Sequence, residues 1–150
     1  MINLTLPWPP SVNHYWFRNK NGSMRVGEKG VLFRDAVNKL IFEEAGIRWR
    51  ASFSSPDFKP LPIFISKKEA EESFITFKTE RLKVVIEAYA PDKRRRDLDN
   101  LQKALLDSLT YAGVWADDDQ VDDLRIYWAR DAAGNKRIAG MIKVCIEVSA

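Results

Sequence analysis

One stretch, residues 91–121, constrains this chain more than any other, because it joins a basic run to a helix and the helix to an acidic cluster. It opens with four consecutive cations, Lys93, Arg94, Arg95 and Arg96. Asp97 and Asp99 follow directly, separated by one apolar residue. A basic run that meets two carboxylates in this way suggests a place where phosphate meets a hard cation.

The middle of this stretch has the apolar spacing of a helix. The stripe consists of Leu98, Leu101, Leu105, Leu109 and Ala112. Gly113 supplies a C-terminal cap, and Lys103 lies on the predicted helix. A second acidic cluster, Asp117, Asp118 and Asp119, comes shortly after the helix ends.

Spacing indicates which of these groups share a region. Asp97 and Asp99 project to the same side of an extended segment, and Asp99 and Lys103 lie one turn apart on one helix face, at roughly 6 Å of rise. From Asp99 the helix climbs about 20 Å, and five extended residues from Gly113 return about 17 Å. Asp118 therefore reaches the same region if the chain reverses at Gly113; otherwise the third acid comes from a partner subunit or from elsewhere.

Three carboxylates packed together repel one another unless a cation lies between them. Ligation by oxygen alone is typical of Mg²⁺ or Mn²⁺, whereas zinc prefers histidine and thiolate, of which the chain has one each, His14 and Cys145. A metal held this way polarises a phosphodiester and activates an attacking water. Lys103 could then stabilise negative charge in the transition state or orient the water.

Structural readings of the same residues compete with this one. Asp97 or Asp99 is an ordinary helix N-cap candidate, and Asp99 with Lys103 is an ordinary surface pair. The aspartates of residues 117–123 could form only a solvated turn. For the N-cap or the surface pair alone, the structural reading is favoured by roughly two to one, and only the combination of all these features favours a functional site.

Length and composition are those of one soluble domain. The chain has 150 residues, of which 45% are hydrophobic, and a formal net charge of +3. This charge is too small to identify a nucleic-acid binder, so local clustering carries more weight. The single cysteine has no partner for an intrachain disulfide, so the sequence does not indicate an oxidising compartment. Neither a signal peptide nor a membrane span is visible. We therefore expect a cytoplasmic protein with no membrane association.

Periodicity predicts the remaining elements. Strands are expected at residues 2–6, 82–89, 124–128 and 142–148, with the last two forming a hairpin about a turn at 131–135. An amphipathic helix is expected across residues 33–41, with Gly46 as its stop. These elements predict an α+β fold in which a small mixed or antiparallel sheet packs against two main helices.

Two segments are harder to place. Residues 11–30 have the composition of a loop, in which aromatic rings interleaved with cations are as consistent with a nucleic-acid contact as with a surface loop. Residues 46–81 contain three prolines and are predicted to be an insertion of mixed structure within the single domain 1–150.

The segment RRRDLDNLQKALLDSLTYAGVWADDDQV, together with LPWPPSVN near the start, closely resembles the RusA family of Holliday-junction resolvases. The resemblance covers residues 2–45 and 82–148. It implies a RusA-like fold and a homodimer that binds four-way DNA junctions. It also implies Mg²⁺- or Mn²⁺-dependent cleavage of two strands by symmetric nicks, in recombination and repair, without a small-molecule cofactor.

The resemblance also assigns site residues by motif position. Asp97, Asp99 and Asp118 are the expected metal-binding catalytic acids, with Lys103 as the catalytic lysine. The register among Asp117, Asp118 and Asp119 stays open, and the spacing to Gln120 favours Asp118. The expected DNA-binding residues are Lys93, Arg94, Arg95, Arg96 and Asn13.

Two other classes of protein remain as alternatives. The chain could be a module that binds junctions or other branched DNA without cleaving them. It could instead be a scaffold or interaction protein whose acidic loop is only surface. A nuclease that acts on other branched DNA or on RNA is a closer variant of the predicted junction nuclease.

Overall fold

The computed structural model describes residues 1–44, 49–51, 60–62 and 77–150. Its centre is a four-stranded sheet in the order β1-β8-β6-β7, formed by β1 (Ile2–Pro7), β8 (Met141–Val148), β6 (Leu82–Tyr89) and β7 (Val121–Trp128). β8 is antiparallel to both β1 and β6, whereas β6 and β7 are parallel. The predicted α+β fold with a mixed sheet is therefore confirmed.

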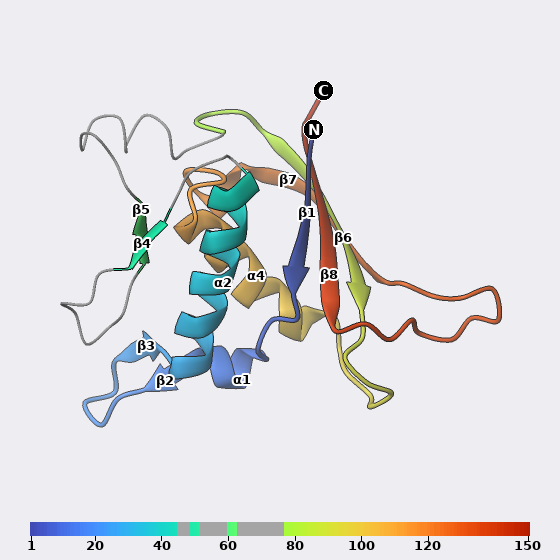
Figure 1. The fold of residues 1–150 in the computed structure, drawn as a ribbon, viewed down its shortest axis with the longest axis horizontal. Coiled ribbons are helices and arrows are strands. Elements are labelled where there is room, and N and C mark those ends of the chain that lie inside the picture. Colours follow the sequence, from blue (N-terminus) through green and yellow to red (C-terminus); the bar gives the residue numbers. More distant parts are fainter. Residues whose placement is uncertain (45–48, 52–59, 63–76) are drawn as a thin grey trace.

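Two long helices, α2 (Glu28–Glu44) and α4 (Asp99–Tyr111), lie on the same side of the sheet (Figure 1). Alternate residues of β6 point toward them, so Leu82, Val84 and Ile86 are fully buried. From α4 the side chains of Leu105 and Leu109 complete this core. The leucine stripe seen in the sequence is thus the buried face of α4, as predicted.

The hairpin predicted between the last two strands is wrong. β6 lies between β7 and β8, and each of them hydrogen-bonds to β6 instead of to the other. The predicted turn does exist, since Asp131 N–H donates to the Asn135 carbonyl at 2.9 Å. Alternation shows that a segment is a strand but not which strand it pairs with, and the parallel β6–β7 pair requires the crossover that α4 provides.

Residues 11–30, predicted as a loop, fold into regular elements. A short helix α1 (Val12–Tyr15) leads into a two-stranded hairpin of β2 (Trp16–Arg18) and β3 (Met24–Val26), which we call the β2–β3 hairpin. α2 then begins at Glu28, five residues before its apolar stripe. Gly30 makes this packing possible, because a Cβ there would lie 2.8 Å from the Tyr15 carbonyl oxygen.

Within residues 46–81, the structure describes one small antiparallel pair, β4 (Trp49–Ala51) with β5 (Pro60–Pro62), and the segment that begins at Phe77. Gly46, the predicted stop of the first helix, and most of the predicted insertion, residues 52–59 and 63–76, lie outside the described residues. Across the part of the chain that is described, no helix has the length and apolar character needed to cross a membrane.

Candidate active site

The C-terminal end of α4 decides where the second acidic cluster lies. Gly113 adopts a φ of 75°, a left-handed conformation that favours glycine. Its N–H donates to the Thr110 carbonyl at 3.0 Å, and the next N–H, that of Val114, donates to the Leu109 carbonyl at 3.1 Å. This Schellman-type cap turns the chain back along the helix, so of the two paths that the sequence left open the chain takes the reversal at Gly113.

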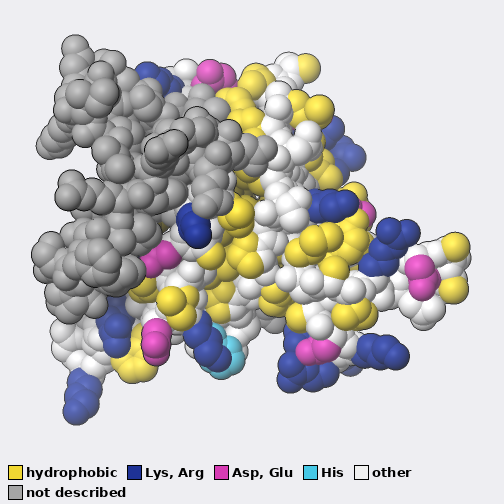
Figure 2. All heavy atoms as spheres, viewed as in Figure 1, with side chains coloured by type: hydrophobic (Ala, Val, Ile, Leu, Met, Phe, Trp, Pro, Cys, Tyr) yellow, Lys and Arg dark blue, Asp and Glu magenta, His cyan; other side chains and the backbone are white. Residues whose placement is uncertain are grey.

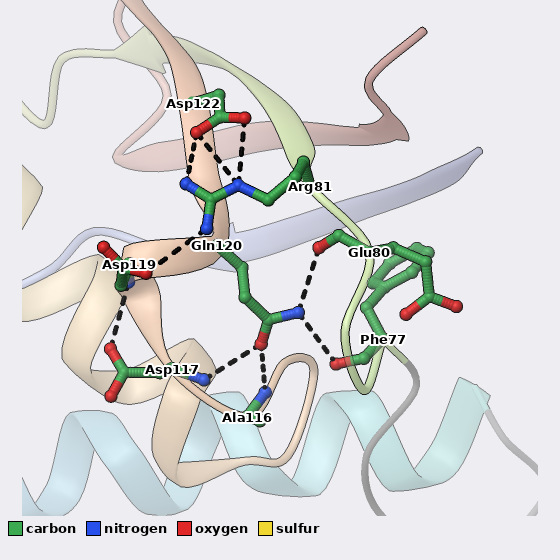
Figure 3. A network of polar contacts seen from close by, with 8 residues as sticks. All are labelled: Phe77, Glu80, Arg81, Ala116, Asp117, Asp119, Gln120 and Asp122. Carbon is green, nitrogen blue, oxygen red and sulfur yellow. Dashed lines mark hydrogen bonds and ion pairs between the residues drawn. The ribbon is translucent and has the colours of Figure 1, made fainter.

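A single glutamine then fixes the loop that follows (Figure 3). Gln120 is 7% exposed, and its side-chain oxygen accepts hydrogen bonds from the N–H groups of Ala116 and Asp117 at 2.8 and 3.1 Å. Its Nε2 donates to the carbonyls of Phe77 and Glu80 at 3.3 and 3.0 Å. All the hydrogen-bonding groups of this amide are used, so Gln120 holds the acidic loop against the segment before β6.

The three consecutive aspartates have different surroundings. Asp119 pairs with Arg81 at 3.2 Å. Asp117 accepts a hydrogen bond from Asp119 N–H at 3.0 Å and caps the short 3₁₀ helix η1 (Asp118–Gln120). Asp118 lines a cavity of about 360 Å³ together with Asp117. Asp119 therefore faces an arginine, whereas Asp118 and Asp117 face the cavity.

We call this space the acidic cavity. Its lining comes from β2, α2, α4 and the loop after α4, and consists of Trp16, Arg34, Lys103, Asp107, Thr110, Tyr111, Asp117 and Asp118. Two of the predicted site residues, Lys103 and Asp118, thus meet although they are far apart in sequence. Asp97 precedes α4, Asp99 is its first residue, and both are exposed and do not line the cavity.

The electrostatics of the acidic cavity centre on Asp118. Partial burial raises the pKa of Asp118 above its ordinary value, and the neighbouring carboxyl groups of Asp117 and Asp107 raise that pKa further. The ammonium group of Lys103 acts in the opposite direction. Carboxylates are therefore close enough here to disfavour one another's charge, which is the condition that a bound cation relieves.

Lys103 itself is held between an acid and an aromatic ring. Its Nζ lies 3.7 Å from Asp107 Oδ2, one helical turn further along α4, and 5.7 Å from the centre of the Trp16 ring. Among the described residues, the buried side-chain atoms that make no hydrogen bond are Asp107 Oδ2 and Trp16 Nε1. Both belong to residues of the acidic cavity, which thus has unused hydrogen-bonding capacity.

The sequence interpretation missed Asp107, Trp16 and Arg34. Asp107 follows Lys103 by four residues, so helical spacing could have placed it beside the lysine. Trp16 and Arg34 come from distant segments, and nothing in their local sequence points to the cavity. Arg34 is held there by Tyr15, whose hydroxyl oxygen accepts from Arg34 Nε at 2.8 Å, and by the Tyr111 ring at 4.7 Å.

The basic run lies in the loop after β6, where two of its four cations are engaged with an acid. Arg94 pairs with Asp92 at 2.8 Å, and Arg96 forms a second ion pair with the same carboxylate. Arg96 and then Arg94 hold the pKa of Asp92 well below its usual range. Lys93 and Arg95 are exposed, and so is Asn13 in α1. Lys and Arg side chains gather at the lower right of Figure 2, where this loop lies in Figure 1.

No three His, Cys, Asp or Glu side chains within the described ranges are grouped as a metal site. The joint site of Asp97, Asp99 and Asp118 therefore stays a prediction. The donors that the acidic cavity offers are nevertheless carboxylates, and the raised pKa of Asp118 reflects their mutual repulsion. This donor set fits a hard divalent cation such as Mg²⁺.

Comparison with known proteins identifies the class. The family model described as Endodeoxyribonuclease RusA matches residues 7–149. The chain belongs to the RusA family of endodeoxyribonucleases. It is 38% identical over 124 residues to the crossover junction endodeoxyribonuclease RusA of Escherichia coli strain K12, and 37% identical to the proteins of that name from Enterobacteria phage 82 and Shigella sonnei. Each alignment covers 83% of this chain and 79% of the relative.

Proposed function

We propose that this protein is a metal-dependent, structure-specific endodeoxyribonuclease that resolves four-way DNA junctions by paired symmetric nicks, in recombination and repair. Its RusA relatives carry the name crossover junction endodeoxyribonuclease. The observation that carries the proposal is the acidic cavity, where Lys103 of α4 and Asp118 of the returning loop face one another. Family and geometry thus support the same chemistry.

Each predicted site residue would have its own role in the reaction. Asp97, Asp99 and Asp118 would hold Mg²⁺ or Mn²⁺, since they provide the oxygen ligands that these ions prefer. When bound, the metal supplies Lewis-acid polarisation of the phosphodiester and a more acidic attacking water. The Lys103 ammonium group stabilises negative charge that develops on the phosphate. Gln120 does not touch the substrate but fixes the position of the loop that carries Asp118.

Exposed cations of the loop after β6 would bind the DNA backbone. Lys93 and Arg95 are free to approach phosphates, whereas Arg94 and Arg96 must first exchange Asp92 for phosphate. Asn13 would add a polar contact from α1. Because these contacts recognise the backbone, they position the DNA without reading its sequence.

We also propose that the active species is a homodimer in the cytoplasm. A four-way junction has two equivalent strands to nick, and a two-fold axis presents two identical sites to them. A monomer would nick one strand per encounter, and the junction would remain unresolved.

The decisive experiment is a nicking assay on a labelled four-way junction, with and without Mg²⁺. We expect two symmetric nicks that need the metal, and their loss in Asp97→Asn and Asp118→Asn variants that still bind the junction. If the wild-type protein binds the junction but never nicks it, the protein is a binding module and not a nuclease. If it shows no preference for the junction over excess linear duplex, the junction proposal is wrong.

A further inference from the structure

The β2–β3 hairpin carries a half-exposed aromatic residue that the proposed chemistry does not use. Cross-strand pairing sets Trp16 against Val26 and Phe17 against Arg25. Because side chains alternate along a strand, Trp16 and Val26 point inward and pack against the core. Phe17 and Arg25 therefore share the outward face, and Phe17 remains 51% exposed.

Arg25 and Phe17 form a stacked unit on this outward face. The Arg25 guanidinium carbon lies 4.6 Å from the centre of the Phe17 ring. Asn19 Oδ1 accepts a hydrogen bond from Arg25 Nε at 3.0 Å, which keeps the guanidinium over the ring. A flat aromatic ring combined with a guanidinium plane is the combination that proteins use to stack on nucleic-acid bases.

Hydrogen bonds close the tip of the β2–β3 hairpin. Asn19 N–H donates to the Ser23 carbonyl at 2.8 Å, and Asn19 Nδ2 donates to Ser23 Oγ at 2.9 Å. Gly22, with a φ of 86°, makes the reversal between them. This network lowers the entropy lost on binding, since it holds Asn19, the hydrogen-bond partner of Arg25, in place.

The hairpin also lies next to the acidic cavity and carries the charge that DNA requires. Trp16, the residue before Phe17, lines the acidic cavity beside Lys103. Arg18 and Lys20 are exposed near the tip. In Figure 2, Lys and Arg side chains and hydrophobic side chains reach the surface at the lower left, where Figure 1 places the hairpin.

We propose that the outward face of the β2–β3 hairpin binds unstacked bases at the branch point of the DNA, with Phe17 stacking on a base and Arg25 supporting it. This inference rests on the proposed function and adds a structural basis for the preference of the protein for branched DNA. A continuous duplex offers no free base face, because every base is covered by its neighbours. At a branch point the stack is interrupted, and an aromatic ring can take the place of the missing neighbour.

The test compares affinities for a four-way junction and for a linear duplex of the same sequence, measured in EDTA so that no DNA is cut. We expect Phe17→Ala to weaken junction binding by about 5- to 150-fold, the range for loss of one base–aromatic stack. Duplex binding should stay within about twofold, because the phosphate contacts are unchanged. Phe17→Tyr should restore junction binding, whereas Phe17→Leu, which is apolar but not flat, should not.

Met24→Ala is the matched control, since Met24 is 58% exposed on the opposite face of the same hairpin. Thermal unfolding of each variant identifies any that fails to fold. The inference is wrong if Phe17→Ala leaves the preference for the junction unchanged, if it weakens duplex and junction equally, or if Phe17→Leu binds as the wild type does. In each of these cases, nicking of the junction by the wild-type protein would still support the proposed function. If the wild-type protein neither bound nor nicked the junction, the proposed function and this inference would both be wrong.

Discussion

Gln120 donates a hydrogen bond from its side-chain Nε2 to the backbone carbonyl of Glu80 at 3.0 Å, across 40 residues of sequence. The same amide accepts from the N–H groups at the start of the acidic loop. One buried side chain therefore links the segment before β6 to the loop that carries Asp118. The glutamine of the acidic motif is thus a structural residue on which the position of Asp118, the proposed active-site acid, depends.

Replacing Gln120 tests this role. In Gln120→Ala, the carbonyls of Phe77 and Glu80 and two backbone N–H groups lose their partner, and we expect the free energy of unfolding to fall by about 2 kcal/mol, within the usual range for unsatisfied buried groups. Junction nicking should fall with it. Denaturant unfolding and the nicking assay measure the two effects.

Gln120→Glu tests separately the two hydrogen bonds that the amide donates. It keeps the acceptor for the Ala116 and Asp117 N–H groups but replaces the donor with a carboxylate beside two carbonyl oxygens. We expect it to be destabilised as well. A Gln120→Glu protein as stable as the wild type would show that the two carbonyl contacts contribute little.

The ion pair between Lys103 and Asp107 predicts a second effect. Asp107→Asn keeps the shape of the side chain but removes the charge that holds the Lys103 ammonium group at 3.7 Å. We expect the single-turnover nicking rate to fall about tenfold, which corresponds to about 1.4 kcal/mol in the barrier. The dissociation constant of the junction should change little, because the proposed role of Lys103 is on the reacting phosphate and not in binding.

Asp123→Asn is the matched control, since Asp123 forms an ion pair with Arg125 at 3.2 Å on the surface of β7, away from the acidic cavity. It should nick at the wild-type rate. If Asp107→Asn weakens binding and leaves the nicking rate of the bound complex intact, Asp107 acts on DNA affinity and not on the position of Lys103.

The carboxylates of the acidic cavity predict that Mg²⁺ stabilises the folded protein. A ligand that binds only the native state at ten times its dissociation constant adds about 1.4 kcal/mol to the free energy of unfolding. We expect a rise in melting temperature with Mg²⁺ in the absence of DNA, and its loss in Asp118→Asn. Without Mg²⁺, that variant should be at least as stable as the wild type, because the substitution removes a charge that its neighbours disfavour.

Asp119→Asn provides the comparison for this measurement. Asp119 is the next residue in the chain, but it pairs with Arg81 and does not line the acidic cavity. Its variant should retain the full Mg²⁺ effect. Equal loss of the effect in both variants would mean that Mg²⁺ responds to the acidic loop in general and not to Asp118.

The basic loop predicts an unequal dependence on salt. Each lost phosphate contact reduces the slope of log binding constant against log salt by about 0.9, so a variant with alanine at all four cations loses up to about 3.6. Lys93→Ala with Arg95→Ala should account for about 1.8 of this. Arg94→Ala with Arg96→Ala should have a smaller effect, because Asp92 already neutralises both arginines in part. Binding titrations at several salt concentrations measure the slopes, and an unchanged slope in all three variants would exclude the loop from the DNA interface.

Much of the fold follows from local patterns. Strict alternation located the four strands of the sheet, and the leucine stripe located α4, because each of these elements buries one face. The pairing of the strands did not follow, since β7 and β8 are close in sequence yet separated by β6. The elements within residues 11–30 did not follow either, because α1 and the β2–β3 hairpin are too short to show a period and depend on contacts such as that between Gly30 and Tyr15.

The sequence by itself indicated the family, because a long motif resembles that of the RusA proteins, and with the family came the proposed chemistry and the proposed roles of Lys103 and Asp118. Helix rise and a glycine cap made a return of the chain toward Lys103 feasible, but they left open whether the chain returns and which aspartate it brings back. Only the tertiary structure decided that Asp117 and Asp118, but not Asp119, line the cavity with Lys103, since Asp119 pairs with Arg81 and Gln120 holds the loop in place. Only the tertiary structure also showed which other residues line the acidic cavity. Trp16 follows α1 and Arg34 lies in α2, and both are brought to the cavity because α1 and α2 pack against α4. Packing between distant segments leaves no local pattern in a sequence.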